Sequence, residues 1–146
     1  MMTPDRLARA TGSTAENAVK YCGYLNEAME RFDIDTPMDR AAFIGGTVAI
    51  ESMNLSAVEE SLYYKDAQYL ANLYKRAFNG EARLAQPYIR NSAKVSELLY
   101  QGYHGRGLIQ LTWLDNYVKA SEALGFDYVS NPKLLVEPWH AAMSAA

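Results

Sequence analysis

Three glutamates lie in a mostly apolar stretch, "AIESMNLSAVEESLYY" (residues 49–64): Glu51, Glu59 and Glu60. Two carboxyl groups can act as general acid and general base when one is protonated and the other is ionised. In an inverting glycosidase the two groups lie about 6.5–9.5 Å apart, on opposite sides of the scissile bond. The stretch is therefore compatible with a catalytic pair, or with solvated charges that flank a turn.

On one continuous helix, the nine positions between Glu51 and Glu60 would separate them by about 13.5 Å and place them on opposite faces. The segment between them, "SMNLS", offers a break in the helix. Asn54 is a plausible helix terminator, and Ser56 is a plausible N-cap for a new helix. A turn at this point would allow the two carboxylates to face each other across a cleft.

A second polar constellation follows in "QGYHGRGLIQLTW" (residues 101–113), which is rich in glycine and then alternates with period two. The alternation predicts a strand with Leu108, Gln110 and Thr112 on one face. Gln110 and Thr112 carry hydrogen-bonding groups of the kind that fix a water or a sugar hydroxyl. Arg106, between two glycines, offers a cation to a buried carboxylate.

The rest of the chain has the spacing of helices. The predicted helices begin after Thr3, after Ser13 or Thr14, after Thr36 and after Asp66, and two more cover residues 92–100 and 114–124, with a last one from Pro138. The second helix carries a predicted core stripe, Val19, Cys22, Leu25, Met29 and Phe32.

The helix after Thr36 is nearly apolar, through Ala42, Phe43, Ile44, Val48 and Ile50, and is predicted to be buried. Gly45 and Gly46 inside it each cost about 1 kcal/mol relative to alanine, and this cost predicts close helix packing.

Length and composition limit the classes of protein. The 146 residues suit one domain, residues 1–146, without repeats or linkers. A formal charge of −3 argues against nucleic acid as the main partner. The chain shows neither a transmembrane run nor a signal peptide, so we expect synthesis in the cytoplasm and no stable membrane association.

The one cysteine and the two histidines of the chain suggest neither a disulfide nor a metal site. Cys22 has no partner for an intramolecular disulfide and is predicted to be a core residue. His104 and His140 are isolated in the sequence and are predicted to be surface or packing residues. We expect a monomer without a metal or another cofactor.

Two ordered motifs carry a family resemblance. "GRGLIQLTWLDNY" (residues 105–117) resembles the signature GRG-x-IQ-L-[ST]-x3-NY of the family-19 glycoside hydrolases, which are chitinases and phage-type endolysins. "AAFIGGTVAIESMNLSAVEESLYY" (residues 41–64) is similar to the upstream segment of that family, which contains H-E-[ST]-GG and then a glutamate in an E-N/S-L-x-Y context. The likeness, over residues 30–146, implies a mainly α fold (α+β lysozyme-like), a helical domain with a small β-hairpin that lines a substrate cleft.

The resemblance also implies roles for residues. Glu51 takes the position of the general acid and Glu60 that of the general base, and Glu59 is then a neighbour of the base. Thr112 takes the position of the hydroxyl that helps to hold the attacking water. The water- and substrate-binding positions together are Thr112, Gln110, Asn116, Arg106 and Tyr64.

The sequence departs from the family pattern at four points, one of which is the short loop between "ELLY" and "YHGRG", where the usual Gly/Asn-rich insertion is lacking. Ile50 stands where the family has a histidine, and Met53-Asn54 stands where it has a glycine pair. The C-terminal third of the family, with a Trp-rich helix and an Asn-Gly loop, has no counterpart, so we expect an incomplete domain.

The predicted function is that of an endolysin-like, inverting glycosidase that cleaves β-1,4 bonds of peptidoglycan, as a lysozyme does. A protein of this kind acts on the cell wall after its release. If the protein derives from a phage, this wall is that of the host cell. A chitinase acting on chitin oligomers is one alternative, since either substrate is an N-acetylhexosamine polymer. A non-catalytic glycan-binding relative and a helical interaction domain are alternatives of other classes.

Overall fold

The computed structural model describes residues 1–146, which divide into two compact units. Unit 1 consists of Met1–Glu60 and Gly105–Ala146, and unit 2 of Ser61–His104. The chain is mostly helical and has two isolated β-bridges in place of extended strands, so the mainly α fold class is confirmed. The longest helix has 17 residues, and no helix combines the length and the apolarity that are needed to cross a bilayer.

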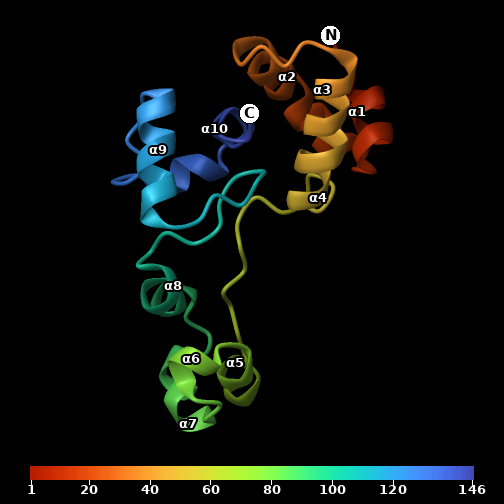
Figure 1. The fold of residues 1–146 in the computed structure, drawn as a ribbon. Helices are drawn as coiled ribbons and strands as arrows, with labels where there is room; N and C mark the ends of the chain where they lie inside the picture. Colours follow the sequence, from red (N-terminus) through yellow and green to blue (C-terminus); the bar gives the residue numbers. More distant parts are fainter. The chain divides into compact units, whose positions relative to one another are not determined.

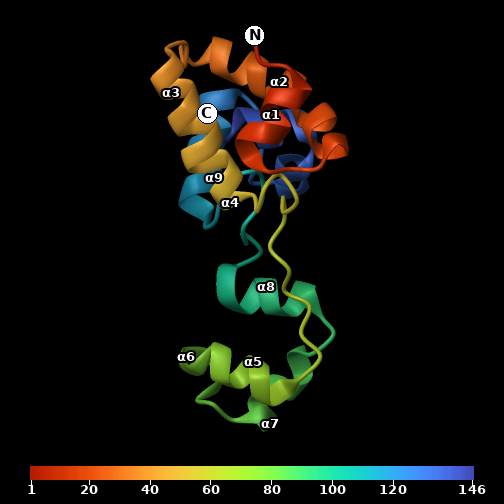
Figure 2. The ribbon, with the colours of Figure 1, turned by 90° about the vertical axis from the view of Figure 1, so that its right-hand side faces the viewer.

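Most of the secondary structure of unit 1 is helical (Figures 1 and 2). Its elements are α1 (Pro4–Thr11), α2 (Ala15–Arg31), α3 (Pro37–Ala41), η1 (Ala42–Val48), α4 (Ala49–Glu51), α9 (Leu114–Leu124), η3 (Pro132–Val136) and α10 (Pro138–Met143). The predicted starts are confirmed by capping contacts, because the hydroxyl oxygens of Thr3, Thr14 and Thr36 each accept a hydrogen bond from a backbone N–H of the first turn.

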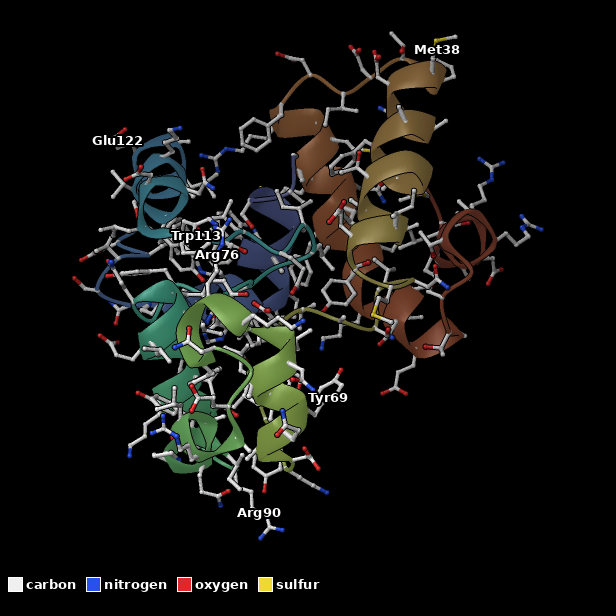
Figure 3. All side chains as sticks on the ribbon, turned by 60° about the horizontal axis from the view of Figure 1, so that its bottom comes forward. Met38, Tyr69, Arg76, Arg90, Trp113 and Glu122 are labelled. Atoms are coloured by element: carbon white, nitrogen blue, oxygen red, sulfur yellow. The ribbon has the colours of Figure 1, made fainter.

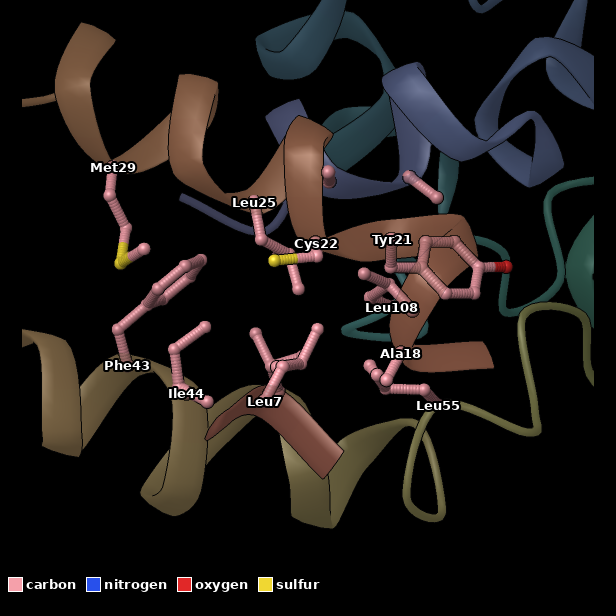
Figure 4. Packing of buried hydrophobic residues seen from close by; sticks show 13 residues of the cluster. Leu7, Ala18, Tyr21, Cys22, Leu25, Met29, Phe43, Ile44, Leu55 and Leu108 are labelled. Atoms are coloured by element: carbon pink, nitrogen blue, oxygen red, sulfur yellow. The ribbon is translucent and has the colours of Figure 1, made fainter. Parts of the chain in front are cut away.

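Helix α2 lies at the centre of unit 1 and packs against α1 and α10. The stripe predicted for it is only partly correct, because Val19 is 67% exposed whereas Ala18 and Tyr21 are buried. The core of unit 1 (Figure 4) comprises Leu7, Ala18, Tyr21, Cys22, Leu25, Met29, Phe43, Ile44, Val48, Leu55, Leu108, Ala141 and Ala142. Leu55 and Leu108 anchor the two segments that carry the candidate site residues to this helical core.

The helix over residues 37–51 is continuous, but its middle part, η1, is π-helical. Phe43, Ile44 and Val48 are buried, whereas Ile50 is 68% exposed, so the prediction that this helix is buried is only partly correct. The close packing predicted at Gly45 and Gly46 is also wrong, because a Cβ at either position would meet no atom within 4 Å. A π-helical segment inside an α-helix is frequent near functional sites, and this one directly precedes Glu51.

The strand predicted for residues 108–113 is absent. A turn from Gly107 to Gln110 replaces it, closed by a hydrogen bond from Gln110 N to Gly107 O at 3.1 Å. Both residues have positive φ angles, +82° for Gly107 and +51° for Gln110. Arg106 forms isolated bridges with Glu59 and with Leu111, which are all that the chain forms of the small hairpin. Period-two alternation was therefore misleading, because Leu108 is buried under the turn and not on the face of a strand.

Unit 2 is a small helical unit with a core of its own. Its elements are α5 (Ala67–Leu73), α6 (Lys75–Phe78), α7 (Ala82–Ala85), η2 (Gln86–Tyr88) and α8 (Ser92–Tyr100). The Asp66 carboxylate caps α5 as predicted, but the helix that begins there is interrupted at Tyr74, where α5 ends and before α6 begins. The buried residues are Leu62, Leu70, Ala71, Phe78, Ala85 and Val95.

Candidate active site

Glu60 lies in an extended segment that is tied to the glycine-rich motif of unit 1. Glu60 N donates to Gly105 O at 2.8 Å, and Gly107 N donates to Val58 O at 2.8 Å. The Glu60 carboxylate in turn accepts a hydrogen bond from Gly105 N at 3.2 Å. Backbone and side chain of Glu60 are therefore both attached to Gly105, across 45 positions of sequence.

Gly105 brings Glu60 close to two other predicted site residues. A Cβ on Gly105 would lie 2.9 Å from Gln110 Oε1 and 3.4 Å from Thr112 Oγ1. The side chains of Gln110 and Thr112 therefore lie against the backbone of Gly105, which holds Glu60, and a Cβ at this position would require the Gln110 side chain to shift. The structure thus gathers Glu60, Gln110 and Thr112 around Gly105.

Thr112 presents its hydroxyl oxygen as an acceptor. Its Oγ1 donates to Gln110 O at 2.8 Å, so the lone pairs of the oxygen are directed elsewhere. Asn116 Nδ2 donates to Thr112 O at 2.9 Å from the first turn of α9. Asn116 is an exposed residue that holds this backbone, and Gln110 Nε2 likewise donates to Gly107 O at 3.1 Å.

Glu51 is the last residue of α4 and is exposed to solvent. The turn predicted after it is present, and Met53, Asn54 and Leu55 all have left-handed φ angles, of 49°, 59° and 63°. Ser52 holds this turn, since its buried hydroxyl donates to Val48 O at 2.5 Å and accepts from Leu55 N at 2.8 Å.

No second helix begins at Ser56, contrary to the prediction, because residues 57–66 are non-helical and residue 59 pairs with Arg106. The helix break between the two glutamates is therefore confirmed, while the N-cap function of Ser56 is wrong.

Arg106 is buried, with 6% of its side chain exposed. Its Nη1 donates to Tyr117 Oη at 2.9 Å, and its Nε lies 3.4 Å from Glu59 Oε1. The cation was predicted to serve a buried carboxylate, but the carboxylate that it meets belongs to Glu59, which is about half exposed. Sequence reasoning missed this contact, because it depends on pairing between distant segments.

Tyr64 belongs to unit 2. Its hydroxyl and that of Tyr74 are 3.1 Å apart, and its ring lies at 6.2 Å from that of Tyr69. Tyr64 O accepts a hydrogen bond from Arg90 N, so Tyr64 forms part of the framework of unit 2.

The two histidines are buried and hydrogen-bonded, as packing residues are. His104 Nδ1 lies 2.6 Å from Ser96 Oγ, and His140 Nδ1 lies 2.8 Å from Tyr128 Oη. Burial lowers the pKa of His140, against a smaller opposing effect of Glu137. Burial also raises the pKa of Tyr128 to about 12.

An apolar cavity of about 490 Å³ lies elsewhere in unit 1, between α1, α2 and the helix over residues 37–51. Its walls include Met2, Met29 and Ile44, with Arg6 and Arg40 beside them. None of the predicted catalytic or substrate-binding residues lines it.

The comparisons with known proteins concern the segment that carries this geometry. The sequence model of glycoside hydrolase family 19, described as chitinase class I, matches residues 41–146. The chain belongs to this family. The matched residues include Glu51, Glu60 and the whole glycine-rich motif, and these three parts of the family-19 chain all belong to unit 1.

Two curated relatives match shorter parts of this family-19 chain. Chitinase 10 of Oryza sativa subsp. japonica is 51% identical over 35 residues, which are 24% of this chain and 12% of that protein. Acidic endochitinase SP2 of Beta vulgaris is 41% identical over 44 residues, which are 30% of this chain and 15% of that protein. The matched segments thus span less than a sixth of the length of either relative.

Proposed function

We propose that this family-19 chain is a glycosidase that hydrolyses β-1,4-linked N-acetylhexosamine polymers with inversion. The observation that carries the proposal is the attachment of Glu60 to Gly105, with Thr112 beside the same glycine. A carboxylate and a hydroxyl acceptor next to each other are the groups that a general base needs to hold and deprotonate one water.

In the proposed reaction, Glu51 protonates the glycosidic oxygen as the bond to the anomeric carbon breaks. A water attacks that carbon from the opposite face and gives one proton to the Glu60 carboxylate. The second hydrogen of the water is directed to Thr112 Oγ1, whose own hydrogen is used by Gln110 O. The products carry the inverted configuration, and the proton taken up by Glu60 restores Glu51 through solvent.

Peptidoglycan is the proposed substrate, in preference to chitin, and charge supports this choice. Unit 2 contains six Lys and Arg against three Asp and Glu, a formal charge of +3, whereas unit 1 contains eight against fourteen, a charge of −6. The cations of unit 2 are exposed, and Arg90 projects from its surface in Figure 3. Seven of the eleven tyrosines also belong to unit 2, including Tyr69, which is 59% exposed.

A cationic surface with flat rings suits an anionic, carboxylate-bearing glycan better than neutral chitin. With peptidoglycan as its substrate, the protein is an endolysin-like enzyme that acts on a cell wall after release. Chitin stays the alternative substrate, since both relatives are named as chitinases.

The test is zymography of the purified chain on murein and on colloidal chitin, each at low and at high salt. Cleared murein, with clearing that weakens as salt rises, is the expected result. Cleared chitin with intact murein would overturn the proposed substrate. Anomeric NMR of the first products reports inversion directly, and a retained configuration would contradict the mechanism.

A non-catalytic glycan-binding protein is the second candidate, because Ile50 replaces the histidine expected beside the acid and is 68% exposed. Sedimentation with insoluble murein distinguishes the two candidates. A chain that binds the polymer and never releases reducing ends is a binding protein, whereas release of reducing ends that is abolished by Glu60→Gln identifies the enzyme.

A further inference from the structure

Glu59 and Glu60 are adjacent in sequence but point to opposite faces of one extended segment. The hydrogen bonds from Glu60 N to Gly105 O and from Gly107 N to Val58 O flank an antiparallel bridge between Glu59 and Arg106. Residues that face each other in such a bridge have neighbouring side chains on the same side. Glu59 therefore faces Arg106, and Glu60 faces Gly105.

The side-chain contacts agree with this alternation. Glu59 Oε1 lies 3.4 Å from Arg106 Nε, whereas Glu60 Oε2 accepts from Gly105 N at 3.2 Å. One glutamate thus meets a cation on one face, and the other glutamate meets the glycine beside Gln110 and Thr112 on the other face.

Arg106 connects the two faces through its backbone. Its N–H donates to Leu111 O at 3.0 Å and its carbonyl accepts from Leu111 N at 2.8 Å, which closes the turn that ends next to Thr112. Its guanidinium also donates to Tyr117 Oη of α9 at 2.9 Å. The position of Arg106 therefore determines where Gly105, Gln110 and Thr112 lie.

We propose that Glu59 is a positioning residue, which acts through Arg106 to hold Glu60 and Thr112 in register. A buried guanidinium requires compensating charge and hydrogen bonds, and the Glu59 carboxylate is an anion at its Nε. Loss of that charge weakens the bridge on the face away from the reaction, and Gly105 with its neighbours shifts. The effect on catalysis rests on the proposed function, while the effect on the register of Gly105 does not.

Many ion pairs with one exposed partner contribute little to stability. Here the exposed fractions of the two side chains differ, 46% for Glu59 and 6% for Arg106. Loss of the Glu59 charge therefore leaves the buried guanidinium of Arg106 with less compensating negative charge. The expected consequence is local, a looser pairing of residues 58–60 with residues 105–107, with the helical core unchanged.

The experiment compares Glu59→Gln, Glu59→Asp and the matched control Glu122→Gln in the full chain. Glu122 is an exposed residue of α9, labelled in Figure 3, and lies outside the paired segments 58–60 and 105–107. The readouts are kcat and KM on solubilised peptidoglycan strands, and the exchange rate of the Gly105 amide hydrogen measured by NMR.

Glu59→Gln is expected to lower kcat about tenfold with KM within about twofold of the parent, because the reacting groups are misplaced while most substrate contacts persist. The Gly105 amide is expected to exchange about tenfold faster, since its local opening becomes easier. Glu59→Asp keeps the charge and recovers most of both quantities. Glu122→Gln behaves as the parent.

A Glu59→Gln variant with parental kcat and a parental Gly105 exchange rate overturns the proposal. So does a variant in which amides of the helical core exchange faster to the same extent, because that result describes a general loss of stability. If the parent cleaves neither murein nor chitin, but Gly105 exchange still rises selectively in Glu59→Gln, the positioning role stands and the proposed function fails.

Discussion

The two candidate catalytic glutamates are supported in different ways. Glu51 ends a helix whose middle is π-helical, is exposed, and is followed by three residues with left-handed φ angles. Glu60 lies in an extended segment and is attached to Gly105 through both its backbone and its carboxylate.

This difference matches the demands of the two proposed roles. A general base must hold a small water in one place, so close support of Glu60 by Gly105 and Thr112 is useful. A general acid must reach a glycosidic oxygen that arrives with the substrate, so an exposed carboxyl at a helix end suits it. The local strain after Glu51 is of the kind that is retained where a turn has a function.

The largest expected effect comes from removing either carboxylate. Glu51→Gln and Glu60→Gln should each lower kcat by about a hundredfold or more, since general acid and base groups contribute about 10²–10⁴. Release of reducing ends from murein measures it. If one of the two variants keeps parental activity, the role proposed for that glutamate is wrong.

The next effect tests the support of Glu60 alone. Gly107→Ala should lower the free energy of unfolding by about 1–3 kcal/mol, because a side chain at φ +82° is strained and its Cβ would lie 3.3 Å from Leu135 O. Chemical denaturation measures this loss of stability. The same variant should also lose enzymatic activity, because Gly107 begins the turn that carries Gln110 and leads to Thr112. The control is Gly125→Ala, which shares a positive φ of 76° but whose Cβ meets no atom within 4 Å.

A smaller effect tests the support of Glu51. Gly45→Ala and Gly46→Ala should each raise the free energy of unfolding by about 0.5–1 kcal/mol, because alanine restricts the unfolded chain and space is free at both positions. Thermal denaturation measures the gain. A loss of stability would show that the π-helical segment needs glycine, and the support of Glu51 would then be more constrained than that of Glu60.

The smallest expected effect lies away from both supports, at His140. Burial lowers its pKa from the ordinary value of 6.5, so the folded state binds the proton less tightly than the unfolded state. Stability should therefore fall as the pH drops below about 6.5, and level off below the pKa of the folded state. Denaturation curves at several pH values measure how the free energy of unfolding changes with pH. His140→Gln should reduce this dependence on pH, while the activity losses caused by Glu51→Gln and Glu60→Gln stay the same.

Local signals in the sequence predicted most of the fold. Thr3, Thr14, Thr36 and Asp66 each begin a helix as expected, because a cap needs only a side-chain oxygen and the N–H groups of the next turn. The break between Glu51 and Glu60 was also predictable from a local signal, because Asn54 tolerates a left-handed φ. The alternation at residues 108–113 failed, because a buried Leu108 and a strand residue look alike in a pattern of apolar and polar residues.

The sequence by itself determined where most of the helices begin, the turn at residues 52–56, the two ordered motifs and hence the candidate residues Glu51, Glu60, Gln110 and Thr112. The tertiary structure alone decided which of these residues meet. Pairing between residues 58–60 and 105–107 joins segments 45 positions apart, and it sends Glu60 to Gly105 and Glu59 to Arg106. Caps and turns depend on neighbours within a few residues, whereas a bridge depends on the packing of distant segments onto one core, through Leu55 and Leu108.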